Sequence, residues 1–311
     1  MIDSNEVNIA VIILTYNQCE RTLACLESLL NIEMPIFNTL VWDNGSKDGT
    51  TAAIQQKFPQ VLIHEHPVNL GVASGRNAAA LLARETWHPT HMIFLDNDML
   101  LEPNFVYGLL RPFLQDPDVG QTQAKLRFMD DPQRINDGGG SRINFVLGQT
   151  IPVGYNEIDH GQHDTIKPCI SCGGAMMVRS DVFNQIDGFD AIFDPFGPED
   201  SDFSLRLQGA GYKALYSPEA VAYHVVSHTF GKGYTEDYAR HKSRHWFVFL
   251  RRHATNWQKL GFYFIGLPLI GFQILIRETR RGNLGAVRGL FAGAFDLLRS
   301  SKVTQKQNDH I

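Results

Sequence analysis

Apolar residues in the first third of the chain form short runs that alternate with segments of helical spacing. The runs are rich in β-branched residues and have the length of strands buried on both faces. They are Asn8–Thr15, Thr39–Trp42, Val61–His66 and His91–Leu95. The segments between them predict helices, from leucines on one helical face or from a high alanine content. They are Glu20–Leu30, Gly49–Phe58 and Val72–Glu85.

This alternation predicts an α/β fold with one Rossmann-like, mostly parallel central sheet flanked by helices. Ligands of such sheets bind beyond the carboxyl ends of the strands. Three polar clusters follow predicted strands directly, and we expect them to meet at one edge of the sheet. They are Thr15-Tyr16-Asn17, Asp43-Asn44-Gly45-Ser46 and Asp96-Asn97-Asp98.

The rest of the chain has a less regular pattern. Residues 125–168 are rich in loops and glycine, which is typical of lids or binding loops. Regular structure is expected again at Gly174–Val178, Asp181–Ile186, Glu199–Gly211 (a helix) and Ser217–His224. From about Tyr234 the pattern is helical throughout. We therefore expect a ligand-binding and catalytic domain over residues 1–233 and a helical C-terminal appendage over 234–311.

Charge is distributed unevenly along the chain. Residues 1–239 contain 15 Lys and Arg against 30 Asp and Glu, whereas residues 240–302 contain 12 Lys and Arg against only Glu278 and Asp296. An acidic body argues against nucleic acid as a ligand, because a phosphate backbone needs a basic surface. The 43% hydrophobic content is ample for a core.

The four cysteines are too few for a disulfide scaffold in 311 residues. Cys169 and Cys172 have the spacing of a metal or redox pair, but no second Cys or His pair accompanies them, so we interpret them as a packing pair in a reducing cytosol. The N-terminus lacks the basic region and apolar run of a signal peptide. The prediction is a cytoplasmic protein.

Asp96-Asn97-Asp98 is the strongest local candidate for chemistry. Two carboxylates that flank one residue at a strand end can offer hard oxygen ligands to one Mg²⁺ or Mn²⁺. Such a cation neutralises charge when a nucleoside diphosphate departs. The alternative is a turn rich in Asp and Asn.

Two other acidic sites have both a chemical and a structural interpretation. Asp43 ends the second strand and can accept a hydrogen bond from a nucleobase, although the Asn-Gly and Asp-Gly pairs after it also form turns. Glu199 and Asp200 open a helix. Its N-terminus stabilises the charged form of a general base, but acidic residues are also common in a first helical turn.

Taken together, these motifs resemble family 2 glycosyltransferases of the GT-A fold, particularly the rhamnosyltransferase-like bacterial members. The likeness covers roughly residues 8–230. Further pieces in the family's order are Asn69–Asn77, Gly173–Met177, Gly188-Phe189-Asp190, Glu199–Arg206, Gly211-Tyr212 and Pro218–His224. One stretch departs from the family: the aromatic-rich segment before Glu199 is here Phe193–Pro198, with two prolines that restrict the backbone.

The resemblance implies roles for individual residues. Asp200, in a pair with Glu199, matches the general base. Asp96 and Asp98 match the motif that binds Mn²⁺ or Mg²⁺, and His224 stands where some members have a third metal ligand. The donor-binding positions are Thr15, Tyr16, Asn17, Asp43, Asn44, Gly71, Arg76, Asp96 and Asn97. Among these, Asp43 would face the base and Arg76 the phosphates.

The implied function is inverting transfer of a sugar from a nucleoside-diphosphate sugar, of the UDP or dTDP type, to a hydroxyl of a glycan or lipid-linked acceptor in cell-surface polysaccharide synthesis. The sequence lacks the motifs of two other classes of nucleotide-binding enzyme. No GxGxxG follows the first strand, and no P-loop is present. The alternative that stays open is a non-catalytic nucleotide-sugar-binding or scaffold protein.

The tail contains a borderline membrane segment. Leu260–Ile276 has no charged residue in 17 positions, but it is interrupted by Pro268 and Gln273 and is shorter than the roughly 20 residues of a span. Arginines flank it on both sides. We expect residues 260–298 to lie on the cytoplasmic face of a membrane. Packing on the catalytic domain, a homodimer contact and a true span are the alternatives.

Overall fold

The computed structural model describes residues 7–32, 36–225, 235–294 and 296. They belong to two compact units. The first unit comprises residues 1–142, 151–194 and 199–226, and the second comprises 143–150, 195–198 and 227–311. Two short inserts of the long N-terminal region thus belong to the second unit. The predicted boundary at 233/234 lies outside the described residues, between 226 and 234, and stays a prediction.

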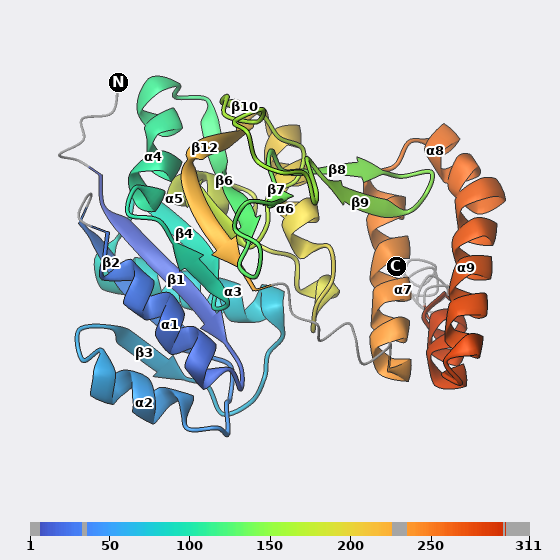
Figure 1. Cartoon of the computed structure of the whole chain (residues 1–311), viewed down its shortest axis with the longest axis horizontal. Helices are drawn as coiled ribbons and strands as arrows, with labels where there is room; N and C mark the ends of the chain where they lie inside the picture. The colour runs from blue at the N-terminus through green and yellow to red at the C-terminus, as the bar shows by residue number, and fades with distance from the viewer. Residues whose placement is uncertain (1–6, 33–35, 226–234, 295, 297–311) are drawn as a thin grey trace, which may run out of the picture. The chain divides into compact units, whose positions relative to one another are not determined.

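The first unit is built on one twisted sheet in the order β10-β12-β6-β11-β4-β1-β2-β3 (Figure 1). β1 pairs in parallel with β2 and β4, β2 with β3, and β6 with β12, whereas β11 runs antiparallel between β4 and β6. The long strands therefore share one direction. Their bounds are β1 Ile9–Thr15, β2 Phe37–Asp43, β3 Leu62–Glu65, β4 His91–Asp96, β6 Val119–Phe128, β11 Ala175–Arg179 and β12 Lys213–His224.

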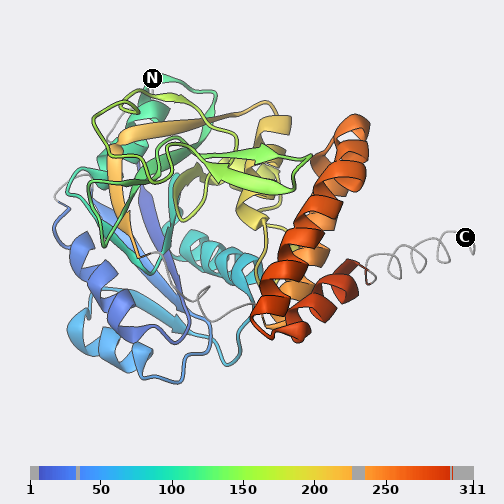
Figure 2. The ribbon, with the colours of Figure 1, turned by 45° about the vertical axis from the view of Figure 1, so that its right-hand side comes forward.

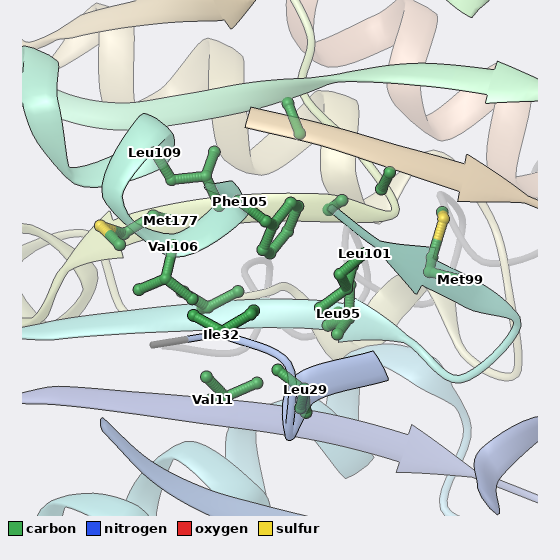
Figure 3. Packing of buried hydrophobic residues seen from close by; sticks show 14 of the residues in the cluster. Val11, Leu29, Ile32, Leu95, Met99, Leu101, Phe105, Val106, Leu109 and Met177 are labelled. Atoms are coloured by element: carbon green, nitrogen blue, oxygen red, sulfur yellow. The ribbon is translucent and has the colours of Figure 1, made fainter. Parts of the chain in front are cut away.

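Helices cover both faces of this sheet because the strand residues alternate between two cores. Val11, Ile13 and Leu95 face a core that α1, α2 and α4 complete, with Phe105 of α4 at its centre (Figure 3). Residues on the opposite face of the strands pack against α3, α5 and α6. The helices are α1 Cys19–Leu29, α2 Thr50–Lys57, α3 Val72–Trp87, α4 Phe105–Gln115, α5 Ser180–Gln185, η2 Ala191–Phe193 and α6 Glu199–Gly209.

The predicted elements of the first third are confirmed, with ends that move by one or two residues. The prediction of a loop over 125–168 is wrong in part. β6 continues to Phe128, and short strands follow: β7 Ile135–Asp137, β8 Ser141–Asn144, β9 Gln149–Pro152 and β10 Lys167–Pro168. β5 (Met99–Leu101) and α4 were not predicted at all. β6 escaped detection because polar residues, Gln121 to Gln123 and Lys125, fill buried positions in it.

A buried ion-pair network explains how Lys125 is accommodated. Its Nζ lies 2.9 Å from Asp159 Oδ2 and also contacts Asp164. Asp159 further receives hydrogen bonds from Arg127, at 3.1 Å from Nε and 2.7 Å from Nη2. Burial raises the pKa of Asp159, but the hydrogen bonds from Lys125, Gly161 and Arg127 outweigh it and lower that pKa to about 2. The network ties the segment after β9 to the central sheet.

The second unit contains the helices of the tail. α7 (Glu236–His253) and α8 (Asn256–Gly261) are each capped by a threonine, Thr235 and Thr255. A π-helical turn, η4 (Phe262–Gly266), leads without a break into α9 (Leu267–Arg280), and a last helix spans Leu284–Ala294. α7 and α9 lie side by side (Figure 2). Asn256–Arg280 is, among the described residues, the one helix long and apolar enough to cross a membrane by length and composition.

The buried network predicts a specific stability loss. Asp159→Asn removes the buried carboxylate that pairs with Lys125 and leaves that ammonium group without its charge partner in the interior. We expect this change to lower the free energy of unfolding by about 3–5 kcal/mol. Asp181→Asn is the matched control. It removes a more exposed pair with Arg179 and should cost less than about 1 kcal/mol. Urea denaturation of both variants measures the difference, and equal losses would contradict the account.

The pKa of Asp159 also predicts how the stability of the fold depends on pH. The folded-state pKa of Asp159 is depressed to about 2, below the unfolded value of about 3.9. Its stabilisation is therefore complete above the unfolded value and is lost as the pH falls through about 2. Wild type should lose more stability than Asp159→Asn across this acid range. Parallel losses would show that Asp159 does not contribute.

Candidate active site

The three polar clusters predicted at the strand ends lie at one edge of the sheet. In the strand register Thr15 stands opposite Asp43, and Leu14 opposite Asp96. The side chains of Thr15, Thr22 and Asn97 form a buried triangle: the two hydroxyls are 2.7 Å apart, and Asn97 Nδ2 donates to both at 3.1 and 2.9 Å. Thr22 was not predicted. Asn97 and Thr15 thus hold the carboxyl ends of β1 and β4 together.

Asp43 is buried and already hydrogen-bonded by its own loop. Its Oδ1 accepts from the Ser46 backbone N–H at 2.8 Å, and its Oδ2 accepts from Thr51 Oγ1 at 2.7 Å. Asn17, in a left-handed conformation, ties the first loop to the second through Ser46 Oγ and the Lys47 N–H. Tyr16, which lies between Thr15 and Asn17 in the sequence, is exposed. These contacts give Asp43 a single fixed orientation at the end of β2.

Asn44 connects the second loop to the entrance of α3. Its Nδ2 donates to Asn69 Oδ1 at 2.9 Å and to the Gly71 carbonyl at 3.0 Å, and its Oδ1 accepts from the Leu70 N–H at 3.1 Å. Gly71 has φ +93°, which favours glycine. A Cβ at Gly71 would also collide with the carboxylate of Asp194. Both constraints explain why glycine stands here.

Asp194 is a site residue that the sequence did not reveal. Its Oδ1 accepts from the Ala73 N–H at 2.9 Å, and its Oδ2 accepts from the Ser74 N–H at 3.2 Å and from the Ser74 hydroxyl. A carboxylate in this place satisfies the open N–H groups of α3 and favours the helix dipole. Asp194 lies in the Phe193–Pro198 stretch that departs from the family pattern, and no local signal marked it.

Arg76 is the centre of the site. Its guanidinium is only 4% exposed. Nη2 donates to Asp96 Oδ1 at 2.8 Å, Nη1 donates to Asp200 Oδ1 at 2.5 Å, and Glu199 Oε1 lies 3.8 Å from Nη1. The guanidinium also lies over the Phe189 ring, 5.4 Å from its centroid. One cation therefore joins α3, the end of β4 and the start of α6.

The charges of this cluster shift the pKa of Arg76 and of Asp200. Burial lowers the pKa of Arg76, but Asp200, Asp96 and Glu199 outweigh it and the net shift is upward. For Asp200 burial is also the largest influence, and it raises the pKa against the opposing effect of Arg76. The sequence-based expectation had considered only the helix N-terminus, which acts in the other direction. Burial makes Asp200 a stronger base than a surface aspartate.

Two glycines leave space beside the second oxygen of each carboxylate. A Cβ at Gly173 would come within 3.0 Å of Asp200 Oδ2, and one at Gly174 within 3.3 Å of Asp96 Oδ2. Gly174 also has φ +73°, and its carbonyl accepts from the Asp96 N–H at 2.8 Å. Arg76 engages the Oδ1 atoms, and glycine at both positions keeps a Cβ away from the Oδ2 atoms.

Asp98 and His224 form a second pair, directed away from Arg76. β5 follows Asp98 and pairs with the end of β12, which places His224 Nε2 3.5 Å from Asp98 Oδ1. His224 Nδ1 lies 3.2 Å from Asn136 Oδ1. Burial raises the pKa of Asp98, with Asp96 adding to the effect and His224 and Arg21 opposing it. Of the three predicted metal ligands, two thus face each other, and Asp96 faces Arg76 instead.

This pair fits a divalent cation that the substrate also coordinates. Within the described part of the chain, no three His, Cys, Asp or Glu residues gather as a metal site. Mg²⁺ is usually bound by one or two carboxylates together with substrate phosphates, and imidazole suits the transition metals. Asp98 and His224 would hold the ion, and phosphate oxygens would complete its shell.

Sequence comparison links the chain to a known family. The model of glycosyl transferase family 2 matches residues 10–186, more than half of the chain, and the model described as N-terminal domain of galactosyltransferase matches residues 168–229. The chain is 29% identical to an N-acetylglucosaminyl-diphospho-decaprenol L-rhamnosyltransferase of Mycobacterium tuberculosis, over 90% of this chain and 97% of that protein. It is 32% identical to a chondroitin synthase of Pasteurella multocida, over 71% of this chain and 25% of that protein.

Structural comparison identifies the fold. A crystal structure of GalNAc-T7 with UDP, GalNAc and Mn²⁺ superposes with a TM-score of 0.67 at 15% identity, covering 84% of this chain and 50% of that one. The mannosyltransferase PcManGT from Pyrobaculum calidifontis, in complex with GDP-Man and Mn²⁺, gives 0.55 at 17% identity, covering 95% of this chain and 79% of that one. The predicted GT-A fold is confirmed.

The close approach of Gly71 to Asp194 predicts a stability difference between two glycines of equal φ. Gly211, with φ +94°, has no atom within 4 Å of an added Cβ, so Gly211→Ala should cost only the conformational strain of about 1–2 kcal/mol. Gly71→Ala adds the collision with Asp194 to a backbone conformation, with ψ 179°, that glycine alone adopts readily, and we expect at least about twice that loss. Thermal unfolding of the two variants decides. Equal shifts in Tm would show that Asp194 moves aside at no cost.

Proposed function

We propose, since the chain belongs to glycosyl transferase family 2, that it moves a sugar from a nucleoside-diphosphate sugar to an acceptor hydroxyl by a metal-assisted, inverting displacement. That the chain is a glycosyltransferase follows from the family. The observation that supports the mechanism is the contact of Arg76 with both Asp96 and Asp200. Through this contact Asp96, on the proposed donor side, and Asp200, on the proposed acceptor side, lie beside the same buried guanidinium.

The donor would lie along the carboxyl ends of β1, β2 and β4. In this proposal Asp43 faces the base at the end of β2, with Thr15, Tyr16, Asn17 and Asn44 around the nucleoside. Gly71, Arg76, Asp96 and Asn97 would border the diphosphate. Arg76 would act there through its positive charge, since its Nη1 and Nη2 already donate to Asp200 and Asp96.

Asp200 is proposed as the general base, with Glu199 beside it. The acceptor oxygen attacks the anomeric carbon while its proton passes to Asp200 Oδ2, and the bond to the diphosphate oxygen breaks with its electron pair on the leaving group. This single displacement inverts the anomeric centre and needs no covalent nucleophile, unlike a retaining glycosidase. A Mn²⁺ or Mg²⁺ ion held by Asp98 and His224 would neutralise charge on the departing diphosphate.

The substrate class is proposed from the relatives. The Mycobacterium tuberculosis protein is named as an L-rhamnosyltransferase of N-acetylglucosaminyl-diphospho-decaprenol, and the Pasteurella multocida protein is named as a chondroitin synthase. We propose a pyrimidine donor, UDP or dTDP, carrying rhamnose or another hexose. The acceptor would be a sugar on a glycan or lipid diphosphate in surface polysaccharide synthesis. The chemistry would belong to residues 1–233, with 234–311 as a separate helical region.

Asp200→Asn tests the base. It removes the proton acceptor at nearly constant shape, and turnover should fall by about 10²–10⁴. Affinity for the nucleoside diphosphate should change little, because Arg76 keeps Asp96 as partner. Steady-state kinetics with calorimetric donor titration measure both quantities, and Asp181→Asn on the surface is the control with unchanged kinetics. Normal turnover with lost donor affinity would make Asp200 a binding residue instead.

Asp98→Ala tests the metal role. Without the carboxylate at the paired site, turnover stimulated by Mn²⁺ or Mg²⁺ should be abolished, and His224→Ala should weaken it and raise the metal concentration needed. Asp118→Ala removes an exposed carboxylate that pairs with Lys213 and should leave turnover unchanged. Wild type treated with a chelator should lose activity and regain it with added metal. Undiminished turnover of Asp98→Ala would remove this residue from the metal site.

A further inference from the structure

The segment Asn256–Arg280 of the second unit is an apolar helix with very little cover. Only 11% of its most apolar 18-residue window is buried. Its contacts within the unit follow one narrow stripe. Phe262 packs edge-on against Phe247 of α7, with the ring centroids 5.8 Å apart. Gly266 passes so close to the Val146 carbonyl that a Cβ would collide with it. The rest of the helix surface faces outward.

The outward face is aromatic and aliphatic. Phe264 is 77% exposed and Phe272 is 64% exposed. Other large apolar residues on this face are Leu267, Leu269 and Leu275. A helix that is apolar all round is normally buried in a core or in lipid. A contiguous exposed apolar surface of this kind marks an interaction site.

Charges at the two ends of the segment identify the partner. Arg251 and Arg252 stand before it, Arg280 and Arg281 stand after it, and all four are exposed. An apolar face with basic residues at both ends is complementary to a lipid surface with anionic headgroups, which attracts the arginines while the acyl region covers the aromatic side chains. A second copy of this chain would bring arginines to the same rim and repel them.

The packing of the segment favours a position along the membrane surface. Asn256–Arg280 is long enough to cross a membrane, so its packing and not its length decides its orientation. Phe262, near its start, packs on Phe247 of α7, and α7 also contains Arg240, Lys242 and Arg244. The last helix is fixed to α7 as well, through a hydrogen bond of 2.9 Å from Ser243 Oγ to the Leu290 carbonyl. A span would carry these charges into lipid at a large cost.

We propose that the outward face of Asn256–Arg280 docks on an anionic lipid bilayer, with the helix parallel to the surface and the arginines at the headgroups. Phe264 and Phe272 would enter the boundary between headgroups and acyl chains. This surface belongs to the second unit alone. The proposal therefore does not rest on the transferase mechanism, and it can be tested without substrates.

The test is flotation of the full-length protein with vesicles of phosphatidylcholine alone and with vesicles that also contain phosphatidylglycerol. Wild type should float with the anionic vesicles and be released by high salt. Phe264→Ser with Phe272→Ser should reduce binding at least roughly tenfold, since each buried phenylalanine contributes strongly to partitioning. Arg251→Gln with Arg280→Gln should weaken binding to the anionic vesicles roughly tenfold or more and flatten its salt dependence.

Controls separate this surface from a general loss of structure. Leu81→Ser changes an exposed leucine on α3 of the first unit and should float like wild type. Circular dichroism checks the fold of each variant, and transfer to a soluble acceptor should be unchanged in the phenylalanine variant. Wild-type flotation of that variant would overturn the proposal. So would a dimer in solution that the same variant converts to monomer, or resistance of the wild type to both salt and carbonate extraction.

Discussion

The buried guanidinium of Arg76 is the interaction on which the rest of the site depends. A cation removed from water is costly unless carboxylates surround it, and here Asp96, Asp200 and Glu199 do so. In turn, the charge of Arg76 opposes the effect of burial on the pKa of Asp200. Arg76 and its carboxylate partners therefore depend on one another.

That arrangement requires α3 to approach the sheet at one depth and angle. Gly71 lets the backbone pass against Asp194, and Asp194 in turn receives the N–H groups of the first turn of α3. Asn44 holds the same turn from the other side. Gly173 and Gly174 complete the site because a Cβ at either position would press against Oδ2 of Asp200 or Asp96. Gly71, Gly173 and Gly174 are therefore explained by close contacts with specific carboxylates.

Much of the fold follows from the sequence because its strands are local apolar runs. β1 to β4 and α1 to α3 could be predicted for this reason, and with them the meeting of Thr15, Asp43 and Asp96 at one edge. β6 could not. Its buried Gln123 accepts from the Gly173 N–H and its Lys125 pairs with Asp159, partners 50 and 34 residues away. Likewise Arg76 and Asp200 were each identified, but a contact across 124 residues depends on side-chain geometry that no local pattern contains.

The central claim is that the cluster around Arg76, together with Asp98 and His224, binds a nucleoside diphosphate jointly with a divalent cation. The most direct measurement is thermal unfolding of the wild type with a panel of nucleoside diphosphates and their sugars, each with and without Mn²⁺. A ligand that binds the folded state raises Tm, by an amount that grows with the logarithm of its concentration relative to Kd. The account predicts stabilisation by one pyrimidine series, and only when Mn²⁺ is present. Equal stabilisation without the metal, or none by any nucleotide, would contradict it.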